Sequence, residues 1–96
     1  MPIFMIERQF AEQLEPTPEI MAGLKEINDS ENVRWLKSFL SADKRKTFCL
    51  YEAADPEALH KAAEKAGIPA DSIMEVGGAL MPTGDINPLS IDQLAA

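Results

Sequence analysis

The sequence predicts one α+β domain whose elements follow the order β-α-β-β-α-β. Three observations lead to this prediction. The chain has 96 residues, which is the length of one domain. Short apolar runs are separated by two segments whose apolar residues recur at helical spacing. Each of those two segments begins with an N-capping residue followed by proline, which is a helix-start signal.

The first strand is expected over residues 2–8, the run PIFMIER, because this run is short, apolar and partly β-branched. The first helix is expected to start at Thr17 as N-cap, with Pro18 at the first helical position and Glu19 in the first turn. The polar residues 28–32 end it. Its buried stripe follows helical spacing and comprises Ile20, Met21, Leu24 and Ile27.

A β-hairpin is expected next. Residues 33–40 and 46–53 are its two strands, and the polar residues 42–45 form the connecting turn. Asp55 and Pro56 then repeat the helix-start chemistry for a second helix.

The second helix is expected to end at Gly67, because Pro69 follows as a stop. A fourth strand is predicted over residues 72–81, with a pair of glycines that allows a bend. The sequence therefore predicts a domain over residues 1–81 and an irregular tail over 82–96 with at most one helical turn. The buried stripe of the second helix comprises Leu59, Ala62, Ala63 and Ala66.

This order of elements favours a ferredoxin-like fold, a four-stranded antiparallel sheet with both helices on one face. Each of the first three strands is apolar on both faces, whereas a half-solvated sheet alternates apolar with polar residues. A homodimer is therefore expected to cover the face without helices. The opposed sets are Phe4 and Ile6 against Ile3 and Met5; Val33, Trp35 and Phe39 against Leu36 and Leu40; and Phe48 and Leu50 against Cys49 and Tyr51.

Composition and charge argue against several classes of protein. The net charge of −7 argues against nucleic acid as a partner, since phosphate binding needs a basic patch. No apolar run approaches the ~20 residues of a membrane span, and the N-terminal segment does not resemble a signal peptide. One cysteine, in an apolar run, is typical of a reducing compartment. We therefore expect a cytoplasmic protein.

A candidate metal site lies on the second helix. His60 is the only histidine, with Glu57 three residues before it and Glu64 four residues after it, so the three share one helix face. Imidazole with carboxylates suits a divalent metal such as nickel or zinc. Water or a carboxylate from a second subunit has to complete the coordination. The alternative is a solvated helix face of ordinary composition.

A candidate ligand pocket involves five residues of the strands. Trp35 and Tyr51 are aromatic with a polar end, which favours half-buried places. Cys49 is a potential nucleophile, although the sequence shows no basic neighbour that lowers its pKa. Glu7 and Glu52 end two strands and form a potential acid–base pair or cation site. The alternatives are core or interface packing for the first three residues and plain edge charges for the two acids.

Four segments of the chain resemble the DUF4242 family of small bacterial nickel-binding-like proteins. They are FMIERQF, VRWLKSF, KTFCLYEA and AGIPAD, and the likeness covers about residues 1–76. The resemblance implies a ferredoxin-like fold, a homodimer or higher oligomer, and nickel binding in at least one member. It also leads us to expect the family's histidine on the second helix, where His60 stands.

Two functions stay open at this point. The first is a non-enzymatic homo-oligomer that binds a divalent metal, nickel first, through His60 and its neighbouring acids. The alternative is a small cofactor-free enzyme, or a small-molecule-binding module, with a pocket near Trp35 and Tyr51.

Overall fold

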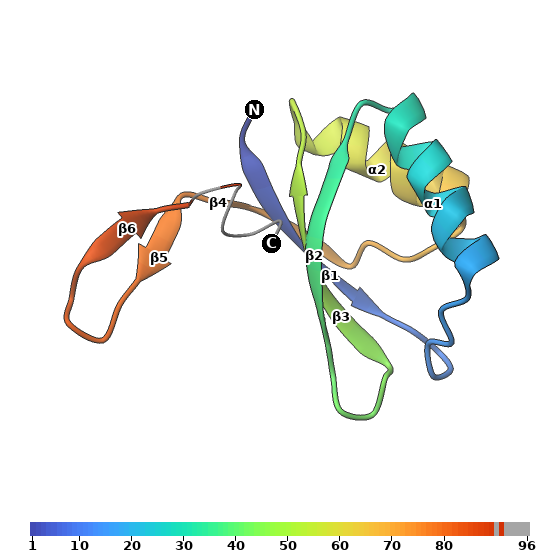
Figure 1. Ribbon diagram of the computed structural model, residues 1–96, viewed down its shortest axis with the longest axis horizontal. Helices are drawn as coiled ribbons and strands as arrows, with labels where there is room; N and C mark the ends of the chain where they lie inside the picture. Colours follow the sequence, from blue (N-terminus) through green and yellow to red (C-terminus); the bar gives the residue numbers. More distant parts are fainter. Residues whose placement is uncertain (90, 92–96) are drawn as a thin grey trace.

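A four-stranded antiparallel sheet with two helices on one face forms the body of the protein (Figure 1). The computed structural model describes residues 1–89 and 91. The sheet has the order β2-β3-β1-β4, and a second sheet pairs β5 with β6. The α+β class and the four-stranded antiparallel sheet are thus confirmed. The elements are β1 Ile3–Gln9, α1 Pro18–Ser30, β2 Arg34–Leu40, β3 Lys46–Glu52, α2 Pro56–Ala66, β4 Ser72–Val76, β5 Gly78–Leu80 and β6 Ile86–Pro88.

Both helices begin at the predicted caps. The Thr17 hydroxyl accepts a hydrogen bond from the backbone N–H of Ile20 at 3.2 Å, and the Asp55 carboxylate accepts one from the N–H of Ala58 at 3.0 Å. Helix α2 ends at Gly67, whose φ of 67° is the left-handed conformation that glycine adopts without strain. These local signals fix where each helix starts and where α2 stops.

The core lies between the sheet and the helices. Ile6 of β1 and Leu59 of α2 are completely enclosed, with 0% and 1% of their surface exposed. Burying side chains of this size contributes about 1.5–3 kcal/mol each. Helix α1 contributes less than α2, because its apolar residues are only half-buried and Ile20 is 50% exposed. The sheet is therefore covered less completely beneath α1 than beneath α2.

A β-bulge interrupts β2 at Leu36. Trp35 lies opposite Tyr51, whereas Lys37 lies opposite Leu50, so Leu36 is the extra residue between the two pairs. An extra residue reverses the alternation of side chains along the rest of the strand. The bulge therefore assigns residues before and after it to faces that simple alternation does not predict.

The predicted faces of β2 are accordingly wrong for two residues, Phe39 and Leu40, and Leu40 lies opposite Thr47 on the helix face. Val33, Trp35 and Phe39 were expected on one face, but Phe39 lies opposite Phe48 on the face without helices. Trp35 pairs with Tyr51 on the helix face, where Val33 joins the core. Simple alternation of side chains across Leu36 assigns the residues after it to the wrong face of the sheet. The bulge is a feature of the pairing with β3 and not of β2 alone.

The sheet face opposite the helices, here called the far face, is largely apolar. Phe39, Phe48 and Met74 are exposed on it to 56%, 37% and 57%. Met5 and Leu50 lie between them in register. The prediction of apolar residues on both faces of the sheet is confirmed.

The segment after β4 forms a hairpin, here called the arm, which projects from the body (Figure 1). The predicted strand over residues 72–81 is wrong in extent, because β4 ends at Val76 and the arm begins at Gly78. The irregular tail is wrong for residues 86–88, which are β6. The helical turn expected near the end falls, apart from residue 91, outside the described residues.

Two glycines allow the close strand pairing and the turn of the arm. A Cβ at Gly78 would stand 2.9 Å from the backbone oxygen of Asn87, so the two strands approach more closely than a side chain allows. Gly84 closes the turn with φ of 90°, and its N–H donates to the carbonyl of Met81 at 2.9 Å. Within the described residues, no helix is both long and apolar enough to span a membrane.

The cap of α2 gives a test of the fold. Asp55→Ala is expected to lower the free energy of unfolding by about 1 kcal/mol, because it leaves the Ala58 N–H without its acceptor. For a domain of this size the melting temperature falls by about 4–8 °C, measured by circular dichroism. Asp55→Asn keeps an oxygen acceptor and is the control. An equal loss in both variants would show that the charge, and not the cap, stabilises α2.

Candidate functional site

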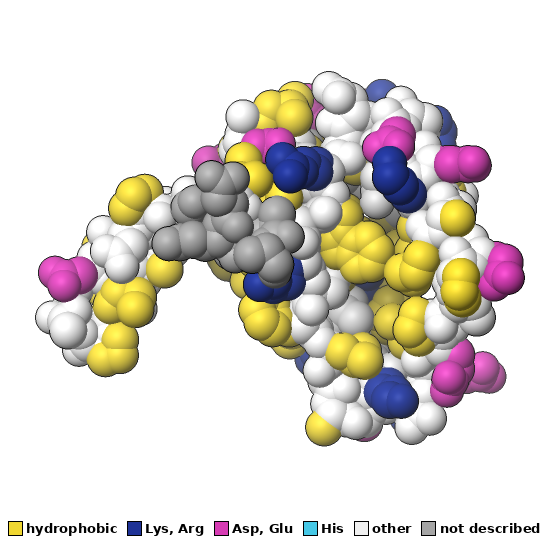
Figure 2. Space-filling model, viewed as in Figure 1, with side chains coloured by type: hydrophobic (Ala, Val, Ile, Leu, Met, Phe, Trp, Pro, Cys, Tyr) yellow, Lys and Arg dark blue, Asp and Glu magenta, His cyan; other side chains and the backbone are white. Residues whose placement is uncertain are grey.

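A cavity of about 90 Å³ lies between α1 and the sheet. Its walls combine Met21 and Leu24 of α1 with Trp35, Cys49 and Tyr51 of the sheet. Figure 2 shows hydrophobic side chains gathered between β2 and α1, where the surface is hollowed. The incomplete cover that α1 gives the sheet is the origin of this cavity.

Arg8 lies in the wall of the cavity and was missed in the sequence. It is only 4% exposed. Its Nη1 donates to the carbonyl oxygen of Pro69, and its Nη2 donates to the Tyr51 hydroxyl at 3.4 Å. The guanidinium carbon is 5.7 Å from the centre of the Tyr51 ring, a cation–π distance. The sequence did carry a signal for the burial of Arg8. Every second residue of a strand faces the same side, so Arg8 shares the face of the core residues Phe4 and Ile6.

Tyr51 is the central aromatic residue of the cavity. Burial raises its pKa, and the charge of Arg8 opposes that rise only in part. Its ring stacks against Trp35, with centroids 6.4 Å apart and planes inclined by 18°. The indole Nε1 of Trp35 in turn donates to the Ser38 hydroxyl at 2.8 Å. Tyr51 therefore keeps its proton at neutral pH and acts as a hydrogen-bonding phenol.

Cys49 is buried beside these residues. Its thiol lies 3.4 Å from the Thr47 hydroxyl, to which it donates. It belongs to the core cluster that includes Phe4 and Ile6. Cys49 is therefore positioned as a packed thiol of the core. Three of the predicted pocket residues, Trp35, Cys49 and Tyr51, do lie together.

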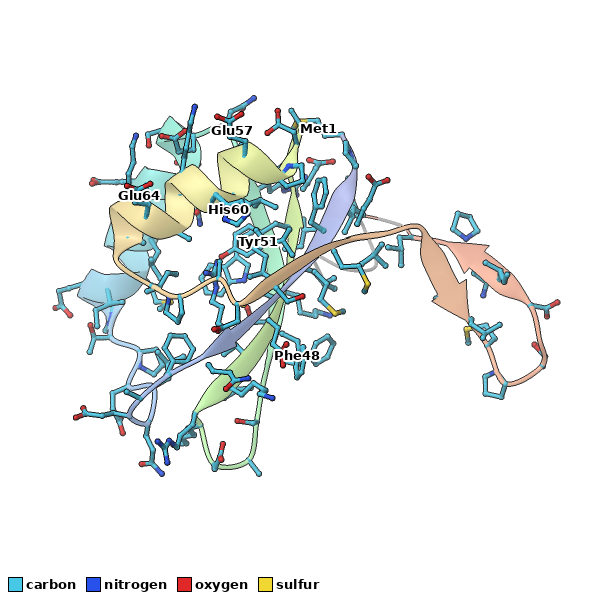
Figure 3. The ribbon with its side chains drawn as sticks, turned by 180° about the vertical axis from the view of Figure 1, so that it is seen from behind. Met1, Phe48, Tyr51, Glu57, His60 and Glu64 are labelled. Atoms are coloured by element: carbon cyan, nitrogen blue, oxygen red, sulfur yellow. The ribbon has the colours of Figure 1, made fainter. Side chains whose placement is uncertain are left out.

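The two predicted acids lie elsewhere. Glu7 pairs in register with Phe48 on the far face, and its carboxylate is 3.1 Å from the Lys46 ammonium. Figure 3 shows Tyr51 beneath α2 and Phe48 on the other side of the sheet. Glu52 lines a separate open groove with Met1 and Trp35. The structure therefore does not bring Glu7 or Glu52 into the cavity beside Tyr51.

The three predicted metal ligands lie on α2 and are exposed (Figure 3). The Glu57 carboxylate is 3.5 Å from the Lys61 ammonium. Glu64 lines a shallow groove with Lys61 and Lys65. Across the residues that the structure describes, no three His, Cys, Asp or Glu side chains are close enough to hold a metal ion. One chain by itself therefore does not present a complete donor set around His60.

The buried phenol gives a direct spectroscopic test. Tyr51 is the one tyrosine of the chain, so tyrosinate absorbance reports it alone. Its midpoint is expected above that of the denatured protein, about pH 10, because burial disfavours the phenolate. A raised pKa means that the unfolding free energy falls as pH rises through the folded midpoint. Coincident titrations of folded and denatured protein would contradict the buried phenol.

Comparisons with known proteins agree with this architecture. The family described as "Nickel responsive protein SCO4226-like" matches residues 4–76, which run from β1 to the end of β4. The crystal structure of SCO4226 from Streptomyces coelicolor A3(2) superposes with a TM-score of 0.60. That protein is 24% identical, over 77% of this chain and 94% of the other. At this identity the likeness shows the fold alone.

No curated protein matches the chain. The name DUF4242 stays a prediction, whereas a nickel-related family is shown. The family match covers about three-quarters of the chain and leaves the arm outside it. The chain belongs to the SCO4226-like family of nickel-responsive proteins.

Proposed function

We propose that this protein is a non-enzymatic homo-oligomer that binds a divalent metal, nickel first. The observation that carries the proposal is the family match over residues 4–76, whose description names nickel responsiveness. The simplest molecular basis for responsiveness is direct binding of the ion. We also assign the fold as ferredoxin-like, an assignment supported by the antiparallel order β4-β1-β3-β2 and by both helices lying on one face.

His60 is the proposed principal ligand, with Glu57 and Glu64. Their exposure leaves them accessible to an ion, and imidazole nitrogen with carboxylate oxygen suits nickel. Because a single chain offers an incomplete donor set among its described residues, water or a second copy of the chain has to complete the site. Completion by a second copy requires a twofold axis near α2, in an interface separate from the far face, because a symmetric interface presents the same residues twice.

The far face and the arm support the oligomer. The exposed side chains of Phe39, Phe48 and Met74 form an apolar surface of a kind that monomers rarely leave uncovered. The arm is also apolar, with Leu80 exposed to 75% and Ile86 to 74%. A second copy of the chain offers matching apolar surface for both.

Nickel titration tests the metal. Calorimetry of protein purified without an affinity tag is expected to show stoichiometric binding at neutral pH, with binding lost in His60→Ala. Glu26→Gln removes an exposed carboxylate from α1 instead of α2 and is the matched control, expected to bind as the natural chain does. Stoichiometric binding that persists in His60→Ala would remove His60 as a ligand.

Light scattering coupled to gel filtration tests the oligomer. Phe39→Asp is expected to yield monomers, because it adds a charge to the apolar far face that forms the proposed interface. Ile20→Asp is the control, since Ile20 is exposed to a similar extent, 50% against 56%, but lies on α1. Circular dichroism checks that both variants fold. A natural chain that elutes as a monomer at all concentrations would contradict the proposal.

A further inference from the structure

The arm is a two-stranded ribbon with one apolar face. In its strand pairing Leu80 lies opposite Ile86, and Ala79 lies opposite Asn87. Residues paired directly across antiparallel strands share a face, and successive residues of a strand alternate between faces. Leu80 and Ile86 therefore lie side by side on one face of the arm, whereas Asn87 lies on the other.

This apolar face is almost bare in a single chain. Leu80 is 75% exposed and Ile86 is 74% exposed, the highest values among the exposed large hydrophobic residues that the structure describes. A sheet with one apolar face normally packs that face against other apolar groups. A two-stranded hairpin by itself is at best marginally stable in water. The arm is therefore built to pack on apolar surface outside its own two strands.

The arm leaves the body on the side of the far face. Both helices lie on one side of the sheet in Figure 1, and the arm projects on the other side. Val76, the last residue of β4, shares the far face with Met74, and only Gly77 separates it from β5. A second copy that packs on the far face thus meets the arm.

The arm is an addition to the part of the chain that the family shares. The family match ends at residue 76, with β4, whereas the arm begins at Gly78. The strands that form the far face lie within the match. An interaction of the arm is therefore a property that the family description does not cover.

The charges of the arm and of one border of the far face are opposite in sign. Between residues 78 and 89 the chain has one charged residue, Asp85. On the far face Lys37 precedes Phe39 by two residues along β2, which is an outer strand. The ion pairs found among the described residues do not include Lys37. The β2 border thus offers a cation beside an exposed aromatic side chain.

We propose that the arm of each copy packs its Leu80–Ile86 face on the far face of a second copy, against Phe39 and Phe48. This inference rests on the proposed homo-oligomer and names the contact that holds its subunits together. Asp85 of the arm then approaches Lys37 of the second copy. A twofold axis makes the exchange reciprocal, so each chain gives one arm and receives one.

The order of the strands selects this border of the second copy. A twofold axis that runs along the strands, between two far faces, places β4 of one copy over β2 of the other. The arm follows β4, and Phe39 lies on β2. Within one chain β2 and β4 are the two outer strands, three strand spacings or about 14 Å apart. The arm thus meets Phe39 of the second copy and starts at the border opposite to its own.

Two variants of neighbouring arm residues test the contact. Ile86→Asp places a carboxylate on the apolar face, and Asn87→Asp, the matched control, places one on the opposite face. Ile86→Asp is expected to raise the dissociation constant of the dimer about tenfold or more in analytical ultracentrifugation, because a buried apolar contact is lost. Asn87→Asp is expected to leave the constant unchanged. Equal effects of the two variants, or no effect of either, would overturn the arm exchange.

Disulfide crosslinking tests which surface receives the arm. The chain's own Cys49 is buried, so engineered cysteines on the surface are the accessible thiols. Ile86→Cys combined with Phe39→Cys is expected to give a covalent dimer on mild oxidation, seen on a non-reducing gel. Ile86→Cys combined with Ile20→Cys is the control, because Ile20 is 50% exposed but lies on α1. A disulfide within one chain, or no more dimer than in the control, would contradict the proposal.

The outcomes separate the arm from the oligomer itself. A natural chain that is monomeric at all concentrations would overturn both proposals. A natural chain that is dimeric, but whose dissociation constant is the same in Ile86→Asp as in Asn87→Asp, would overturn the arm exchange alone. Circular dichroism checks that the variants fold, which is expected because Ile86 is largely exposed in the single chain.

Discussion

The burial of Arg8 between β1, β3 and the loop after α2 is the contact on which the helix side of the protein depends. Its guanidinium bonds the Pro69 carbonyl and the Tyr51 hydroxyl, so one side chain joins three segments distant in sequence. Two bonds of Asp71 hold the same loop to β1, one from its N–H to Glu7 and one from Gln9 to its carboxylate.

Three surfaces of different chemistry follow from this arrangement. The helix face of the sheet encloses a small, almost wholly apolar cavity beside the buried Arg8, the far face is an open and largely apolar surface, and the outer side of α2 carries imidazole and carboxylates. They are built from different residues, since alternation along β1 sends Arg8 to one face and Glu7 to the other. A second subunit on the far face and an ion on α2 would therefore not compete for the same side chains.

The sequence predicted the features that depend on local chemistry. Thr17 and Asp55 cap their helices as expected, because a cap requires only neighbouring residues. The bulge at Leu36 depends on pairing with another strand. The alternation of apolar residues within β2 therefore did not predict it. Of the candidate pocket, Trp35, Cys49 and Tyr51 were found together. Glu7 and Glu52 were grouped with them as acids at the ends of two strands, although alternation assigns Glu7 to the opposite face. The metal ligands remain a prediction.

The bulge at Leu36 also affects the tendency of the protein to aggregate through β-pairing. β2 is an outer strand of the sheet, and a regular outer strand offers its free backbone groups as a template for uncontrolled β-pairing. The extra residue at Leu36 breaks that ladder, and Arg34 and Lys37 place like charges along the same border. The other border, β4, has only five residues. Copies of this chain are thereby discouraged from growing sideways into ribbons.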